Sequence, residues 1–335
     1  MRPWLSLAVL SVLLCAPAVA APEAAPDLLV LRRTIALPKV EGRIDHFAID
    51  AEGKRLVVAA LGNGSVEVID LAQGKVVRSL GGLAEPQGIG IVPSTGRIAV
   101  ASGGDGTLRQ YDGTTFEALA PMHLGDDADN LRVEPVTERL VVGYGGGGLA
   151  LVTPGQAPTL VPLSAHPESF QLEAGGARVF VNVPGAGHVA VVDRVTAKVL
   201  ARWPLQEAHQ NFPMAFDEPH QRLLVGCRAP ARLLVLDTTP GAREAGRLVA
   251  SLEISGDVDD VCEDRARHRF YLSCGAGFVD VVEQKDADRY ERIGRAPTAA
   301  GARTAIFVPA TSSLYVAVPH RGAQGAEVRE YVAKP

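Results

Sequence analysis

The sequence lacks the short motifs that mark many enzyme classes. It has no GxSxG elbow, no HExxH helix, no P-loop and no GxGxxG turn between a strand and a helix. The stretch YGGGG, from Tyr144 to Gly148, has the glycines of a phosphate-binding loop but is flanked by strand-like segments. Because a phosphate loop needs a helix N-terminus behind it, we interpret this stretch as a turn between strands.

Cysteine is scarce and forms no recognisable motif. Of the four cysteines, only Cys227, Cys262 and Cys274 follow the N-terminal region, and none belongs to CxxC or CxxCH. A redox pair and covalently attached haem therefore have no support. All three lie in apolar, strand-like segments, so we expect them to be mostly unpaired, buried core residues.

Only one long hydrophobic run is present. It extends from Trp4 to Cys15, follows Arg2 and precedes small residues up to Ala20, which predicts a secretory signal peptide over residues 1–20, cut after Ala20. Leu14 occupies the position where a lipoprotein signal needs a small residue, so we favour free release into the periplasm or the medium. No later hydrophobic run reaches the roughly 18 residues that a membrane span needs, so no membrane-spanning segment is predicted.

Positive charge is not in excess. The chain has 33 Lys and Arg residues against 38 Asp and Glu residues, which gives a net charge of -5. This balance provides no general electrostatic attraction to nucleic acid, so nucleic acid is not indicated as a partner.

The chain does contain a repeat. Seven copies of one strand pattern recur at intervals of about 40 residues. They are RLVVAAL at Arg55, RIAVASG at Arg97, RLVVGYG at Arg139, RVFVNVP at Arg178, RLLVGCR at Arg222, RFYLSCG at Arg269 and SLYVAVP at Ser313. Each copy follows an apolar segment and precedes a turn and two further strands, and four strands per repeat are typical of a propeller blade. We predict an all-β, seven-bladed propeller of four-stranded antiparallel blades, a single domain over residues 28–335 after a short linker at 21–27.

The two ends of the chain are predicted to meet in one blade. The last repeat ends at EVREYVAKP with only three strands, while LLVLRRTIALP at residues 28–38 precedes the first complete repeat. We expect this N-terminal segment to be the fourth strand of the last blade, because closing the ring removes an open sheet edge.

Acidic residues end the third strand of five repeats, and their regular recurrence indicates a structural role in turns. They are Asp70, Asp112, Asp193, Asp237 and Glu283.

The repeat unit with RLVVAAL followed by GSVEVIDLAQGKVV, over residues 55–77, resembles the YVTN-type, or YncE-like, seven-bladed propellers of secreted bacterial proteins. The resemblance covers essentially all of the chain after the signal, although YVTN itself is replaced by FVNV at 180–183 and YVAV at 315–318. It implies the fold more than a function. Such repeats occur in periplasmic proteins of unassigned role, and related propellers serve as lactonases, amine dehydrogenase heavy chains and surface-layer proteins.

The residues at the start of each innermost strand should surround one mouth of the central channel, a concave place suited to ligands. Aligned repeats place there Asp45, Gln87, Asp129, Glu168, Phe212, Asp259 and Arg303, each followed by His46, Gly88, Asn130, Ser169, Pro213, Asp260 and Thr304. The predicted ligand-binding residues are Asp45, His46, Gln87, Asp129, Asn130, Glu168, Asn211, Asp259, Asp260 and Arg303. The alternative is that these groups only cap strand ends and bond to water or to the neighbouring blade.

Histidines add to this surface. His46, His166 and His209 lie in the connections that lead into innermost strands. Imidazole, carboxylate and amide groups suit zinc or calcium, but only neighbours such as Asp129, Asn130 and Glu168 are expected to share an ion. Arg303 is expected to neutralise Asp259 or Asp260.

Two classes of function follow, with a third held open. The first is a monomeric periplasmic binding or scaffold protein that holds a small ligand or protein partner on its polar top face. The second is a metal-assisted hydrolase of the lactonase kind, with a channel carboxylate as ligand or base. The third is a heavy-chain-like subunit in periplasmic electron transfer, which requires a cofactor-bearing partner.

Overall fold

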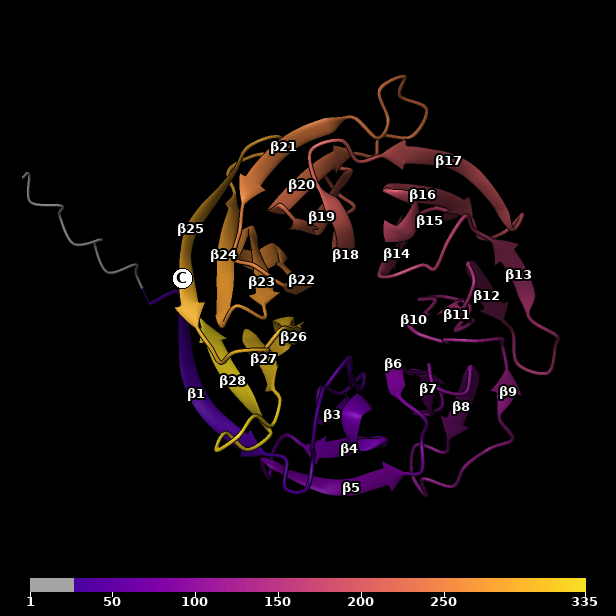
Figure 1. Cartoon of the computed structure of the whole chain (residues 1–335), viewed down its shortest axis with the longest axis vertical. Helices are drawn as coiled ribbons and strands as arrows, with labels where there is room; N and C mark the ends of the chain where they lie inside the picture. The colour runs from indigo at the N-terminus through magenta and orange to yellow at the C-terminus, as the bar shows by residue number, and fades with distance from the viewer. Residues whose placement is uncertain (1–26) are drawn as a thin grey trace, which may run out of the picture.

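The computed structural model describes residues 27–335, so the predicted signal peptide and residues 21–26 of the predicted linker lie outside it. Seven four-stranded sheets are arranged around a central axis (Figure 1). This arrangement confirms the predicted all-β, seven-bladed propeller of antiparallel blades. Among the described residues, no helix is long and apolar enough to cross a membrane.

The first strand of blades 1 to 6 lies nearest the axis and the fourth lies at the rim (Figure 1). Blades 1 to 3 consist of β2 (Phe47–Ile49), β3 (Arg55–Ala60), β4 (Ser65–Asp70), β5 (Lys75–Gly81); β6 (Pro86–Ile91), β7 (Ile98–Ser102), β8 (Thr107–Tyr111), β9 (Met122–His123); and β10 (Leu131–Val133), β11 (Leu140–Tyr144), β12 (Gly148–Val152), β13 (Thr159–Pro162). Blades 4 to 6 consist of β14 (Phe170–Leu172), β15 (Arg178–Val183), β16 (His188–Asp193), β17 (Lys198–Pro204); β18 (His209–Asp217), β19 (Arg222–Ala229), β20 (Ala231–Asp237), β21 (Leu248–Glu253); and β22 (Val258–Asp264), β23 (Arg269–Cys274), β24 (Phe278–Gln284), β25 (Tyr290–Pro297). Blade 7 consists of β26 (Thr304–Val308), β27 (Ser313–Val318), β28 (Glu327–Ala333) and β1 (Leu29–Ala36).

Short 3-10 turns follow some of these strands: η1 (Leu61–Asn63), η2 (Pro184–Ala186), η3 (Arg265–Arg267) and η4 (Pro309–Thr311). The YGGGG stretch is the turn between β11 and β12, as predicted.

The core lies in slabs between neighbouring blades. In β3, Leu56 and Val58 pack with residues of blade 7, whereas Val57 and Ala59 pack with residues of blade 2. Each of these four side chains is at most 1% exposed. Since alternate residues of a strand point to opposite faces, an unbroken apolar strand fits a sheet that is covered on both sides.

The ends of the chain close the ring. β1 pairs antiparallel with β28, with Ile35 opposite Val328, and so completes blade 7 as predicted. Ile35 is 1% exposed and packs in the slab shared by blades 7 and 1.

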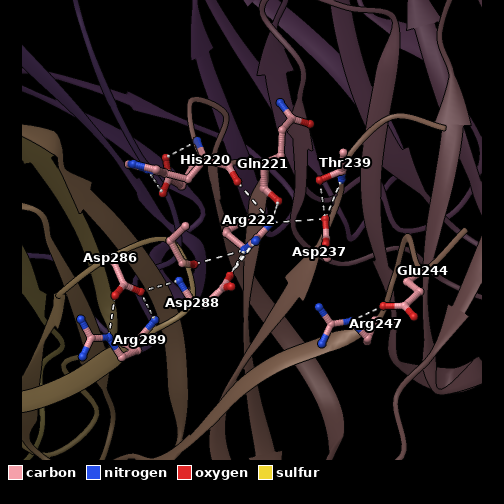
Figure 2. Close-up of polar contacts among 12 residues, drawn as sticks. His220, Gln221, Arg222, Asp237, Thr239, Glu244, Arg247, Asp286, Asp288 and Arg289 are labelled. Atoms are coloured by element: carbon pink, nitrogen blue, oxygen red, sulfur yellow. Dashed lines mark hydrogen bonds and ion pairs between the residues drawn. The ribbon is translucent and has the colours of Figure 1, made fainter. Parts of the chain in front are cut away.

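Five of the six repeated arginines at the start of the second strand bind one blade to the next. Arg55 Nη1 of blade 1 donates to the carbonyl oxygen of Gly113 in blade 2 at 2.6 Å. Figure 2 shows Arg222 of blade 5, whose Nη2 lies 2.6 Å from a carboxylate oxygen of Asp288 in blade 6. Three further arginines donate, like Arg55, to a backbone carbonyl oxygen of the following blade. They are Arg139, which donates to Arg194, Arg178 to Thr238 and Arg269 to Lys334.

Blade 7 has Ser313 at this position, and Arg33 of β1 lies where the ring closes. Arg33 forms an ion pair with Glu330, which also accepts a hydrogen bond from Ser313 Oγ at 2.9 Å. The guanidinium of Arg33 lies beside Gly74 of blade 1. A Cβ atom added to Gly74 would be 3.2 Å from Arg33 Nη1. Arg33 therefore spans the junction of blades 7 and 1.

Four of the five acidic residues at third-strand ends hold turns, as expected. Asp70 accepts the backbone N–H of Gln73 at 2.8 Å, and Asp112, Asp193 and Asp237 accept equivalent bonds. Glu283 is an exception, because it pairs with Lys285 while Asp286 accepts the backbone N–H groups of its turn.

The three cysteines of the described chain are free, as predicted. Cys227 and Cys274 are fully buried, and Cys262 is partly buried. Burial raises the pKa of the Cys227 thiol to about 12 and also raises the pKa of Cys262 and Cys274, so the reactive thiolate is suppressed.

We therefore expect no thiol of the folded chain that begins at Ala21 to react with a disulfide reagent at about pH 8. After unfolding without reductant, three thiols per chain should react. Titration with the reagent before and after unfolding measures both numbers, and a single reactive thiol in the unfolded sample would demonstrate a disulfide.

Candidate functional site

A cavity of about 420 Å³ lies at the channel mouth, where loops lead into the innermost strands. Nine of the ten predicted ligand-binding residues line it: Asp45, His46, Gln87, Asp129, Asn130, Glu168, Asp259, Asp260 and Arg303. The register of the repeat therefore brings side chains from six blades to one place.

Asn211 is the predicted residue that does not line this cavity. It is fully buried and donates to Asn182 Oδ1 at 2.8 Å and to the carbonyl oxygen of His188 at 3.2 Å. β18 starts early, at His209, so Asn211 lies within the strand ladder opposite Cys227. Its amide serves the contact with blade 4, and we leave it out of the candidate site.

Several lining residues were absent from the predicted set: Arg43, Glu85, Asp127, His166 and Arg228. Only His166 had a signal in the sequence, as a histidine in a connection to an innermost strand. The others come from loops and strand ends whose positions vary between repeats.

One side of the cavity is neutralised by arginine. Arg303 Nε lies 2.9 Å from Asp259 Oδ2, as expected, and Arg228 pairs with the other oxygen of Asp259. Asp260 instead accepts the backbone N–H of Ala305 at 2.7 Å. Burial, with the nearby charge of Asp259, raises the pKa of Asp260 to about 7 although His46 opposes the shift.

The Asp45–His46 pair lies immediately before β2 of blade 1. His46 Nε2 is 3.0 Å from Asn130 Oδ1, and its Nδ1 faces Asp45 Oδ2 at 3.7 Å. Burial opposes protonation of the ring, but Asp45, Asp129 and Asp260 outweigh it and raise the pKa of His46 to about 9. Burial likewise disfavours the Asp45 carboxylate, yet His46 and Arg43 lower its pKa to about 2.

Asp129, His166 and Glu168 form a second group beside the first. His166 Nδ1 is 3.0 Å from the carbonyl oxygen of Gly145, and its Nε2 faces Asp129 Oδ2 at 3.6 Å. The contact with Asp129 raises the pKa of His166 to about 9. Burial and the charge of Asp129 raise the pKa of Glu168 to about 8. The carboxylates thus favour positive charge at both imidazoles.

Three buried atoms in this region have no hydrogen-bond partner: Asp45 Oδ2, His46 Nδ1 and Asp129 Oδ1. Asp45 is 4% exposed and Asp129 is 6% exposed, so water does not readily satisfy them. A buried polar atom without a partner costs about 1–3 kcal/mol. A bound cation would satisfy the two carboxylate oxygens among these atoms.

The residues form two sets of possible metal ligands, Asp45 with His46 and Asp129, and Asp129 with His166 and Glu168. Within each set, the donor atoms lie within 4.8 Å of one another. The predicted metal set of Asp129, Asn130 and Glu168 stays a prediction. The structure places Asp129 and Glu168 together, but the Asn130 oxygen contacts the His46 ring and orients it.

Comparison with solved structures supports the fold. The chain is similar to Kuenenia stuttgartiensis hydrazine synthase, with 14% identity, a TM-score of 0.69, and coverage of 81% of this chain and 91% of the other. It is similar to the Cps50 (Swd1) β-propeller domain of Myceliophteria thermophila, with 12% identity, a TM-score of 0.70 and coverage of 91% and 100%. The RRP9 WD40 repeats give 10% identity, a TM-score of 0.76 and coverage of 90% and 97%.

Sequence comparison gives no closer relationship, since no family model and no curated protein matches the chain. At these identities, the structural similarity concerns the propeller fold alone. The function of this protein therefore has to be argued from the residues at the channel mouth.

Proposed function

We propose that this protein is a periplasmic, YncE-like binding propeller whose channel mouth holds a divalent metal ion. One observation carries the proposal: Asp45, His46 and Asp129 are mutually close, and each has a buried atom without a hydrogen-bond partner. A cation bound between them would satisfy these atoms, and the remaining space in the cavity would admit a small ligand.

The donor types favour zinc over calcium. Each set of ligands includes one imidazole nitrogen in addition to carboxylate oxygens. Zinc binds nitrogen and oxygen donors in sets of three or four, whereas calcium takes six to eight oxygens. We therefore choose zinc as the first ion to test.

Replacing Asp129 by Asn together with Glu168 by Gln should weaken zinc binding by more than about 100-fold, because direct ligands matter more than the groups that orient them. Side-chain shape is retained, so the melting temperature of the metal-free protein should change little. Calorimetric titration with zinc and thermal melting provide the two measurements.

The control variant is Asp126→Asn with Glu117→Gln, which makes the same chemical changes at exposed positions that do not line the cavity. It should bind zinc as the parent does. If the parent has no affinity for zinc, or if the Asp129 and Glu168 variant binds equally well, the proposal is wrong.

A second candidate function is metal-assisted hydrolysis of the lactonase kind. It is favoured by the position of the ligand sets at a cavity of about 420 Å³, which is the size of small-molecule sites. A zinc-bound water is a nucleophile at neutral pH and attacks carbonyl carbon. Lactone hydrolysis by the zinc-loaded parent, lost in the Asp129 and Glu168 variant, would support an enzyme; no turnover of any lactone would leave the binding role.

A further inference from the structure

The five possible ligands at the channel mouth do not form one group. Two sets of three each have donor atoms within 4.8 Å of one another, and Asp129 is the residue common to both. Zinc bonds to oxygen and nitrogen are about 2.0–2.2 Å, so the donors of one tetrahedral ion lie within about 4 Å of one another. Each set would need only small side-chain rotations to reach that spacing, whereas no group of donors within 4.8 Å of one another contains all five residues.

We propose that the channel mouth is a two-metal centre in which the Asp129 carboxylate bridges the ions. One ion is bound by Asp45, His46 and Asp129, and the other by Asp129, His166 and Glu168. This inference rests on the proposed metal-binding function and specifies how many ions are bound and by which residues.

The surroundings of Asp129 suit a bridge. Its Oδ2 faces His166 Nε2 at 3.6 Å, while its Oδ1 is buried and has no hydrogen-bond partner. The backbone is fixed, because Asp129 N–H donates to the carbonyl oxygen of Gly143 at 3.0 Å. The remaining partnerless atoms at the mouth, Asp45 Oδ2 and His46 Nδ1, belong to the first set. Each carboxylate oxygen of Asp129 is thus available to a different ion.

Both histidines are oriented as metal ligands are. His46 has Nε2 3.0 Å from Asn130 Oδ1, and His166 has Nδ1 3.0 Å from the carbonyl oxygen of Gly145. An oxygen acceptor at one ring nitrogen fixes a proton there, so that loss of the second proton leaves a lone pair on the other nitrogen for a metal ion. That second nitrogen faces a carboxylate oxygen at 3.7 Å for His46 and at 3.6 Å for His166.

These separations are longer than a hydrogen bond, which is normally 2.7–3.2 Å for nitrogen and oxygen. Positive charge is therefore required between the ring nitrogen and the carboxylate, and a metal ion would supply it in place of a proton. The same arrangement occurs twice, with separate orienting contacts in different blades, and this duplication is what argues for two ions. Carboxylate-bridged pairs of this type hold ions about 3.5–4 Å apart.

The test is the ratio of zinc to protein after loading and removal of free metal. The parent should retain about two ions per chain, and His46→Gln and His166→Gln should each retain about one. Asp129→Ala should retain almost none, because both sets lose a ligand. His209→Gln is the matched control, since His209 is exposed and does not line the cavity, and it should retain the parental number.

A titration of the unmodified protein with Co²⁺, followed by its visible absorption, requires no variant. It should saturate at about two equivalents. Saturation at one equivalent, or complete loss of zinc in each histidine variant, would overturn the bridge while leaving a single-ion binding function intact. No binding of either metal by the parent would overturn the proposed function itself.

Discussion

Deletion of residues 28–38 is expected to lower the free energy of unfolding by more than about 5 kcal/mol, or to leave the protein insoluble. The segment contains β1, the fourth strand of blade 7, which pairs with β28. It buries Leu29, Ile35 and Leu37, and loss of each such side chain alone typically costs about 2–5 kcal/mol. Denaturant unfolding of the truncated chain, compared with the chain that begins at Ala21, measures the effect.

Deletion of residues 21–26 provides the control, since it leaves β1 in place. This shorter truncation should unfold at the parental denaturant concentration. Parental stability and solubility after deletion of residues 28–38 would show that the propeller does not depend on its N-terminal strand.

Substitution of Arg33 by Met should lower the free energy of unfolding by about 3 kcal/mol. Glu330 is 2% exposed and depends on Arg33 and Ser313 at the junction of blades 7 and 1. Without the Arg33 guanidinium, the negative charge of Glu330 stays buried with too little positive charge beside it. Removing one partner of a buried ion pair in this way is strongly destabilising. Denaturant unfolding at neutral pH gives the value.

Arg32→Met is the matched control, because Arg32 contacts the same carboxylate at 3.4 Å but is 61% exposed. Its cost should be below about 1 kcal/mol. Adding Glu330→Gln to Arg33→Met should recover part of the lost stability, because no buried charge then remains. Equal costs for the two arginine variants would refute a special role of Arg33 in closing the ring.

The fold could be predicted because every blade of the propeller repeats the same strand pattern. A strand such as Arg55–Ala60 is apolar on both faces, which only a sheet between two neighbours accommodates. Seven such strands at intervals of about 40 residues also determine the number of blades, and the incomplete last repeat identifies the partner of β1. Blade 7 lacks the repeated arginine, but the contribution of Arg33 could not be predicted because it depends on pairing across the whole chain.

The candidate site could be predicted only as far as the repeat register determines it. Equivalent positions such as Asp45, Asp129 and Asp259 necessarily surround the channel, and all three line the cavity. Asn211 lay outside this register, and an early strand start buried it. The partners of each carboxylate depend on loop lengths, which is why Asp259 meets arginine whereas Asp129 meets His166.

The Asp45–His46 pair is accordingly both architectural and chemical. Its position is that of one repeat among seven, immediately before an innermost strand. Its chemistry comes from its surroundings, because Asn130 orients the imidazole and the facing atoms of both residues have no hydrogen-bond partner.

Anomalous diffraction at the zinc absorption edge, from crystals of the zinc-loaded protein, tests the central claim most directly. The account predicts two anomalous peaks at the channel mouth, on opposite sides of the Asp129 carboxylate, one beside His46 and one beside His166. Anomalous density elsewhere, with only water between Asp45, His46 and Asp129, would contradict it.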